Sequence, residues 1–122
     1  MRPAVEYTGS GRLDDPRLVW QERTAEDAVV IAIRNRHLDA FLAPQLSELL
    51  ARFVRSSRGS KLVLDLGRVD FMDASALGAI VYAFRVMDAE FHLVGVGERI
   101  RKLMRSTGVD RLFDLDPGSR NA

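Results

Sequence analysis

The stretch Leu62-Val-Leu-Asp-Leu-Gly-Arg-Val-Asp-Phe-Met-Asp-Ala-Ser-Ala-Leu-Gly78 carries the signals that decide the fold. It contains most of a short apolar run, Lys61–Leu66, which we interpret as a strand buried on both faces. A helix then begins near Asp73 or Ala74, because aspartate is a favoured N-cap residue. A buried strand that leads through a loop into a helix is typical of a sheet covered by helices.

Upstream of this stretch, the pattern predicts two strands and a helix. Arg17–Arg23 is a plausible short edge strand, and Ala28–Arg34 is rich in β-branched residues. The polar segment Thr24–Asp27 between them predicts a turn, so the two strands would form a hairpin. A helix is predicted over Phe41–Ser57, where apolar residues recur at helical spacing: Leu42, Leu46, Leu49, Leu50, Phe53 and Val54.

Downstream, the pattern predicts a strand between two helices. The helix after Asp73 has a core face of Leu77, Ile80, Val81 and Phe84. Phe91–Val96 follows as another buried strand, and Glu98–Thr107 as a short helix with Gly108 suited to its C-terminal end. Val109–Leu115 is predicted to add a last short strand or turn.

The order β-β-α-β-α-β-α places the chain in the α/β class. We expect a mostly mixed or parallel β-sheet of about four to five strands with helices packed on it. Residues 17–115 form the predicted domain. Residues 1–16 and 116–122 are rich in Gly, Pro, Ser and charged residues, and we expect both to be flexible tails.

Composition excludes several classes of function. The chain has 122 residues and a formal net charge of +1, so charge alone gives no reason to expect nucleic acid or membrane partners. It has no cysteine, and its two histidines, His37 and His92, match no metal-binding spacing. Residues 1–16 lack the apolar core of a signal peptide, and no apolar run approaches the length of a membrane span. We expect a cytoplasmic protein.

Ser75 is the residue with the most informative position. It would lie in the first turn of the helix after Asp73, where backbone amides are unpaired and the helix dipole is positive. A phosphate placed there gains hydrogen bonds, although Asp70 and Asp73 would repel it. It also adds about −1.5 to −2 charge to the surface. The fold would tolerate a phosphoserine, whereas a protein docked on this face would not. Taken alone, a serine at such a position is more often a simple capping or surface residue.

The central stretch resembles the STAS domain, a family named for sulphate transporters and anti-sigma factor antagonists. The family pattern is a strand of the type V-L-D-L followed by V-x-F-[MI]-D-[SA]-S-[GA]-L-G. The matching residues here are Leu64-Asp-Leu66, Val69, Phe71-Met-Asp73, Ser75 and Leu77-Gly78. Weaker matches upstream and downstream extend the resemblance over about 28–113: Arg36-His-Leu-Asp39, Leu93-Val-Gly-Val96, Arg99 to Arg105 and Thr107 to Phe113.

The resemblance implies that this is an anti-sigma factor antagonist. Ser75 would be phosphorylated by a GHKL-type anti-sigma factor serine kinase, and a serine phosphatase would reverse the modification. The unphosphorylated form would bind the kinase and release a sigma factor. The docking surface would include Asp39, Asp73, Ala74 and Ala76. We expect a monomer or a weak dimer, with no resident cofactor.

Three departures from the family pattern concern local structure. Ala76 stands where the family often has glycine, and Arg36 replaces the usual glycine before the first helix. The segment Phe84–Phe91 is a few residues short and lacks the expected glycines, so the helix must end early or the turn must be tight.

Three alternatives stay open. Ser75, His37 and Asp39 are the residue types of a hydrolase triad, but no G-x-S-x-G elbow surrounds Ser75. Asp65, Asp70 and Asp73 suggest a cation site, although an aspartate in a strand is more often a structural acceptor. The third alternative is an adaptor or scaffold subunit of a transporter or stress-signalling complex that is not phosphorylated. With neither a P-loop nor a Gly-rich kinase loop, the chain is expected to be a substrate and not an enzyme.

Overall fold

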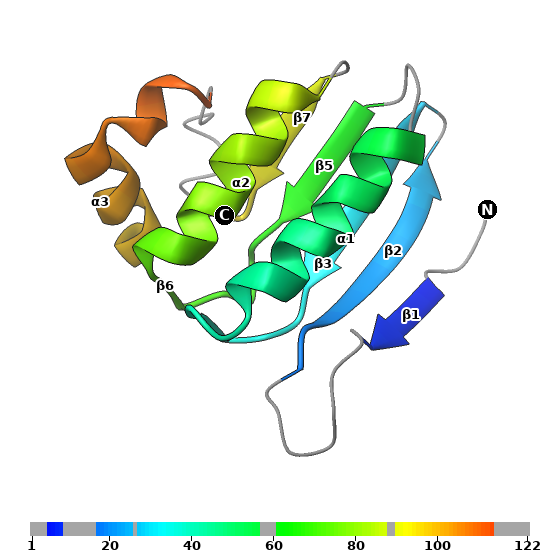
Figure 1. The fold of residues 1–122 in the computed structure, drawn as a ribbon, viewed down its shortest axis with the longest axis horizontal. Helices are drawn as coiled ribbons and strands as arrows, with labels where there is room; N and C mark the ends of the chain where they lie inside the picture. The colour runs from blue at the N-terminus through cyan, green and yellow to red at the C-terminus, as the bar shows by residue number, and fades with distance from the viewer. Residues whose placement is uncertain (1–4, 9–16, 26, 57–60, 88–89, 114–122) are drawn as a thin grey trace.

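The computed structural model describes residues 5–8, 17–25, 27–56, 61–87 and 90–113. Its main feature is a five-stranded mixed sheet in the order β1-β2-β3-β5-β7 (Figure 1). The strands are β1 (Val5–Thr8), β2 (Val19–Ala25), β3 (Ala28–Ile33), β5 (Lys61–Asp65) and β7 (Phe91–Val94). The first three pair antiparallel, and β3, β5 and β7 pair parallel. The predicted α/β class, the mixed sheet and the rough order of elements along the chain are confirmed, although β1 and two short strands described below were not predicted.

The helices are α1 (Ala43–Ser56), α2 (Ala74–Val86) and α3 (Glu98–Thr107). Figure 1 shows α1 and α2 lying across one face of the sheet, with α3 on the side of α2 away from α1. After α3, the described residues 108–113 form a single 3-10 turn, η1 (Val109–Arg111), and no strand. Gly108 joins the two with φ of 79°, the left-handed conformation that favours glycine at a helix end. In the described residues, no helix has the length and apolar character that a membrane span requires.

The structure differs from the prediction before the predicted domain and in its first hairpin. Residues 5–8, which we expected in a flexible tail, pair with β2 as the edge strand β1. Backbone pairing is enough to add an edge strand, so a low apolar content did not reveal it. The hairpin turn is also shorter than expected, because β2 and β3 remain paired up to Ala25 and Ala28. The predicted tail 116–122 lies outside the described residues.

The interpretation of Lys61–Leu66 as a strand buried on both faces is wrong. Leu62, Leu64 and Leu66 are buried, but Val63 and Asp65 between them are only half-buried. The strand β7 alternates in the same way, with His92 exposed. The reason is that α1 and α2 both cover the same face, so the described helices leave the other face of these strands open.

The core lies between the sheet and the helices. Its fully buried members come from every layer and include Leu18, Ile31, Ile33, Leu46, Leu50, Leu64, Ile80, Ile100 and Met104. An aromatic cluster closes the end of the core beside β7, where the rings of Phe84, Phe91 and Phe113 pack with centroids 4.7 to 6.2 Å apart. This cluster joins α2, β7 and the segment after η1.

A second, two-stranded sheet positions the candidate site. The strand β4 (His37–Leu38) runs parallel to β6 (Phe71–Met72), with His37 opposite Phe71 and Leu38 opposite Met72. Each strand comes directly before the turn that leads into α1 or α2. The pairing therefore brings the N-terminal ends of the two helices side by side.

Candidate functional site

The helix α2 starts where the sequence predicted. Asp73 is its N-cap residue, with extended backbone angles, and its carboxylate accepts a hydrogen bond from the backbone amide of Ala76 at 3.1 Å. The carbonyl of Asp73 also accepts from the amide of Leu77, the first bond of the helical ladder. An N-cap of this type stabilises a helix by about 1 kcal/mol. The start of α2 is therefore fixed by one carboxylate.

Ser75 lies in the first turn of α2, and its side chain is exposed. It sits between the N-cap Asp73 and the first core residues of the helix, Ala76 and Leu77, which are 0% and 3% exposed. A group added to the hydroxyl would project into solvent beside the amides of the first turn. The position combines access for a modifying enzyme with a rigid support.

The β4–β6 pairing brings Asp39 next to this turn. Asp39 directly follows β4, as Asp73 follows β6, and the amide of Asp73 donates to the carbonyl of Leu38 at 3.1 Å. The carboxylate of Asp39 accepts from the amide of Phe41 at 3.0 Å. Its carbonyl accepts from the amides of Leu42 and Ala43, also at 3.0 Å. Asp39 thus shapes the turn into α1 and lies near the start of α2.

Arg36, which directly precedes β4, is hydrogen-bonded to Asp70, which directly precedes β6. Its guanidinium donates from Nε and Nη2 to one carboxylate oxygen of Asp70, at 2.9 and 2.7 Å. Its backbone carbonyl accepts from the amides of Asp70 and Phe71 at 2.7 and 3.1 Å. The backbone hydrogen bonds between the two loops do not depend on the side chain at position 36. The arginine that replaces the family's usual glycine adds an exposed ion pair to them.

Of the four predicted docking residues, three lie at the surface and one does not. Ala74 is exposed, and Asp39 and Asp73 are half-buried. Ala76 is 0% exposed because it faces the core from the first turn of α2. The prediction that Ala76 belongs to the docking surface is therefore wrong, since no partner atom reaches a fully buried methyl group.

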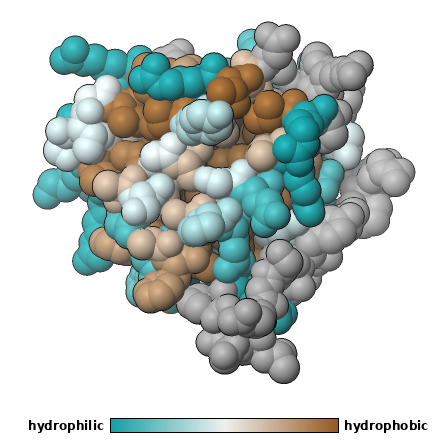
Figure 2. Space-filling model, viewed as in Figure 1, coloured by the Kyte–Doolittle hydropathy of each residue, from teal (hydrophilic) through white to brown (hydrophobic). Residues whose placement is uncertain are grey.

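Sequence reasoning missed the exposed apolar side chains around the site. Phe41 is 72% exposed in the turn before α1, and Phe71 is 42% exposed in β6. Tyr82 and Val86, 68% and 45% exposed, extend along the outer side of α2. Figure 2 shows apolar side chains open to solvent on this helical face, with hydrophilic side chains among them. For Tyr82 and Val86, the position off the core stripe of α2 was the signal that could have identified them.

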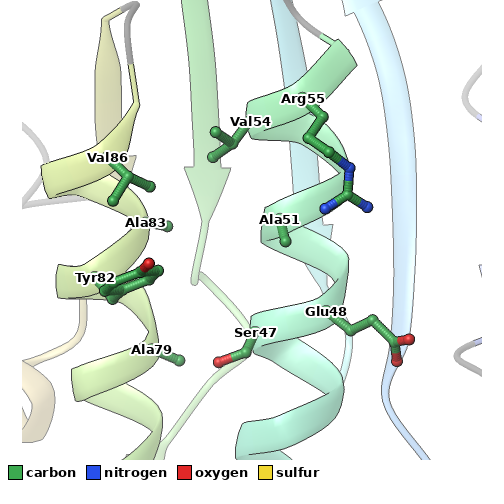
Figure 3. Close-up of a pocket in the computed structure, with 9 residues that line it drawn as sticks. All are labelled: Ser47, Glu48, Ala51, Val54, Arg55, Ala79, Tyr82, Ala83 and Val86. Carbon is green, nitrogen blue, oxygen red and sulfur yellow. The ribbon is translucent and has the colours of Figure 1, made fainter.

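A shallow groove of about 440 Å³ runs between α1 and α2. Small side chains line both helices, with Ser47 and Ala51 on α1 opposite Ala79 and Ala83 on α2 (Figure 3). Glu48 and Arg55 lie on the outer side of α1, so the rim there carries both signs of charge. This groove has no side-chain arrangement that singles out one kind of ligand.

The residues of the two alternative sites have other partners in the structure. His37 is exposed, and its ring packs edge-on against Phe71 with centroids 6.0 Å apart. Within the described ranges, no hydrogen bond joins Ser75 to His37 or Asp39. The three aspartates proposed for a cation also have separate roles: Asp65 accepts from Gly67, Asp70 pairs with Arg36, and Asp73 caps α2. No cluster of three or more potential metal ligands occurs in the described part of the chain.

Comparison with known proteins gives a consistent result. The anti-sigma-B factor antagonist of Staphylococcus aureus is 28% identical over 101 residues, which cover 80% of this chain and 93% of that protein. Among solved structures, an anti-sigma factor antagonist from Mycobacterium paratuberculosis superposes with a TM-score of 0.72 at 22% identity, covering 82% of this chain and 86% of that one.

A second solved structure is the Bacillus cell fate determinant SpoIIAA in its phosphorylated form. It superposes with a TM-score of 0.59 at 18% identity and covers 77% of this chain and 87% of its own. At these identities, both structures show likeness of fold. The family model of the STAS domain matches residues 20–122. The chain therefore belongs to the STAS domain family.

Proposed function

We propose that this protein is an anti-sigma factor antagonist that is switched off by phosphorylation of Ser75. The observation that carries the proposal is the exposed hydroxyl of Ser75 in the capped first turn of α2, directly above a buried core. The relative in S. aureus is named an anti-sigma-B factor antagonist, and a protein of similar fold has been solved in a phosphorylated form.

In its unphosphorylated state, the protein would bind an anti-sigma factor serine kinase of the GHKL type and so free a sigma factor. The kinase supplies ATP and Mg²⁺. The Ser75 oxygen forms a bond to the γ-phosphorus as the bond to ADP breaks, and the hydroxyl proton passes to a base of the kinase. A serine phosphatase would restore the hydroxyl by hydrolysis.

The first turn of α2 explains how one modification acts on a partner and spares the fold. The phosphate would lie near the positive end of the helix dipole, which favours negative charge. The carboxylates of Asp39 and Asp73 lie on the same surface, so the site becomes strongly negative after phosphorylation. Release of a docked protein then follows from charge and bulk at the surface, without a change in the core.

Intact-mass measurement tests the proposal directly. The full chain is incubated with ATP, Mg²⁺ and each candidate anti-sigma factor kinase from the same genome. We expect the mass of a single phosphate to be added to wild type and none to Ser75→Ala. In a binding assay, Ser75→Asp should lose affinity for the kinase by about tenfold or more, whereas Ser75→Ala should bind as tightly as wild type.

Two results would contradict the proposal. Equal affinity of wild type, Ser75→Ala and Ser75→Asp for the kinase would show that Ser75 does not control binding. Absence of phosphorylation by every candidate, together with stable binding to a transporter ATPase, would favour the adaptor hypothesis.

A further inference from the structure

The α1–α2 groove selects no particular ligand, but the helical face around it is complementary to itself. At the middle of the groove, Ala51 on α1 lies opposite Ala83 on α2 (Figure 3). Ala83 is buried, and both side chains are small. The distance between packed helices depends on the size of the side chains at the contact. Another helical surface can therefore approach this face closely at the level of the two alanines.

Two opposite charges flank this level on the outer side of α1. Glu48 comes three residues before Ala51 and Arg55 comes four residues after it, and both side chains are exposed and border the groove. Seven residues are nearly two helical turns, so the two charges lie about 10 Å apart along one side of the helix. The ion pairs found in the described residues include neither of them. Each charge is thus available to an oppositely charged side chain of another molecule.

Two exposed apolar side chains flank the same level on α2. Tyr82 comes directly before Ala83, and Val86 comes three residues after it. Both side chains border the groove (Figure 3), and their spacing of four residues makes them neighbours on the helix surface. They expose apolar area that a second surface would remove from water.

We propose that the α1–α2 face binds the same face of a second copy of this chain, with a two-fold axis that crosses the middle of the groove. Such an axis places each helix antiparallel to its equivalent in the second copy. Because Glu48 and Arg55 lie on either side of the axis, each faces the other residue of the second copy. Tyr82 and Val86 also lie on either side of the axis, so each packs against the other residue of the second copy.

The charges determine the orientation of the dimer more than its affinity. The antiparallel arrangement brings each acid to a base, and every such contact occurs twice because the interface is symmetric. Ion pairs between exposed side chains add little to affinity, so we expect a weak dimer whose population depends on concentration. Ser75 does not line this groove, and the inference is therefore independent of the proposed function.

Analytical ultracentrifugation of the full chain tests the inference over about 1 μM to 1 mM protein. We expect a reversible equilibrium between monomer and dimer for wild type. Glu48→Arg and Arg55→Glu each bring like charges together at both symmetric contacts, so each should raise the dimer Kd by about tenfold at low salt and by less at high salt. The matched control is Arg85→Glu, which reverses a charge on α2 outside the groove and should dimerise within about twofold of wild type.

Mixing the two charge variants distinguishes this interface from a general effect of charge. In a dimer of one Glu48→Arg chain and one Arg55→Glu chain, both symmetric contacts again join a base and an acid. We expect the equimolar mixture to dimerise about as tightly as wild type, although each variant alone does not. Tyr82→Ala should raise the dimer Kd by about tenfold. Thermal unfolding should show a Tm near that of wild type for every variant, because the substituted side chains are exposed.

Four results would overturn the inference. The first is a wild-type chain that stays monomeric at the highest concentration. The second is a dimer that neither the charge variants nor Tyr82→Ala weakens, because its interface lies elsewhere. The third is an equal loss in Arg85→Glu, and the fourth is a mixture that fails to restore the dimer, which contradicts the two-fold pairing. The phosphorylation assay on Ser75 is separate, so the proposed function stands under all four.

Discussion

Asp73 and Ala76 are joined across the first turn of α2 by a 3.1 Å hydrogen bond from the amide of Ala76 to the carboxylate of Asp73, and Ser75 lies exposed within that turn. The bond makes the helix start independent of the serine hydroxyl. A chemical change at Ser75 therefore leaves the cap in place. The same bond also makes Asp73 a structural residue, whatever its contact with a partner.

Removing the cap should lower stability without changing the fold. We expect Asp73→Ala to reduce the free energy of unfolding by about 1 kcal/mol, because an N-cap oxygen is lost. For a chain of this size, that corresponds to a fall in Tm of about 3–5 °C. Asp73→Asn, which keeps a capping oxygen, is the control and should melt near wild type. Equal losses in both variants would show that charge, and not capping, is the contribution of Asp73.

Phosphorylation of Ser75 should change the stability of the isolated domain little. A phosphate near a helix N-terminus gains about 0.3–1 kcal/mol from the dipole, and the nearby aspartates oppose it. We expect the Tm of phosphorylated protein to lie within about 5 °C of the unmodified form. Thermal unfolding followed by circular dichroism measures this. A large fall in Tm would mean that the modification disrupts the domain itself.

The ion pair between Arg36 and Asp70 should contribute little to stability. The two side chains are 78% and 48% exposed, so solvent screens their attraction, and we expect Arg36→Ala to cost less than about 1 kcal/mol. The amides of Asp70 and Phe71 donate to the carbonyl of Arg36, which the substitution leaves in place. Hydrogen exchange at these two amides should therefore stay slow in Arg36→Ala. Fast exchange there would show that the guanidinium holds the loop.

Two glycines should respond in opposite ways to alanine. Gly78→Ala should raise stability by about 1 kcal/mol, because a Cβ atom has open space there and alanine favours the helix. Gly95 has φ of 69°, and a Cβ atom would come within 2.9 Å of Asp65 Oδ1 and of Gly67. Gly95→Ala should therefore destabilise by more than about 1 kcal/mol. Chemical denaturation of both variants provides the comparison, and a loss of stability in Gly78→Ala would contradict the geometry of α2.

Leu77→Asp should prevent cooperative folding. Leu77 is 3% exposed and follows Ala76 in the first turns of α2, so the substitution places an unpaired charge in the core. We expect a loss of the sharp thermal transition, measured by near-ultraviolet circular dichroism. The control is Gly78→Asp, one residue further on, where the side chain projects into open space and a cooperative transition should persist. A near-normal melt of Leu77→Asp would show that the helix is rotated.

Much of the fold was predictable because local patterns and tertiary structure agree. The start of α2 was predictable because aspartate is a favoured N-cap residue, which places the cap at Asp73. The buried stripe of α1 follows from the helical spacing of its leucines. The outward position of Ser75 follows from the same helical periodicity. That periodicity also indicates that Ala76 faces inward with Ile80 and Ala83, so the error at Ala76 was avoidable.

Other features depend on contacts that no local pattern reports. The proximity of Asp39 to Asp73 is set by the β4–β6 pairing, whose strands are two residues long and too short to give a periodic signal. The open face of β5 was hidden because Val63 is apolar, although it lies on the side that the helices leave uncovered. The groove between α1 and α2 depends on how the two helices sit on the sheet, which composition and spacing do not specify.

The cluster of Phe84, Phe91 and Phe113 has a consequence for how the protein is made. Its third ring comes from the segment after η1, far along the chain from most of the sheet. A nascent chain that has not yet delivered Phe113 from the ribosome leaves the other two aromatic rings without their last packing partner. Such a chain exposes apolar surface that the complete domain buries. An interruption of synthesis before residue 113 therefore favours aggregation over folding.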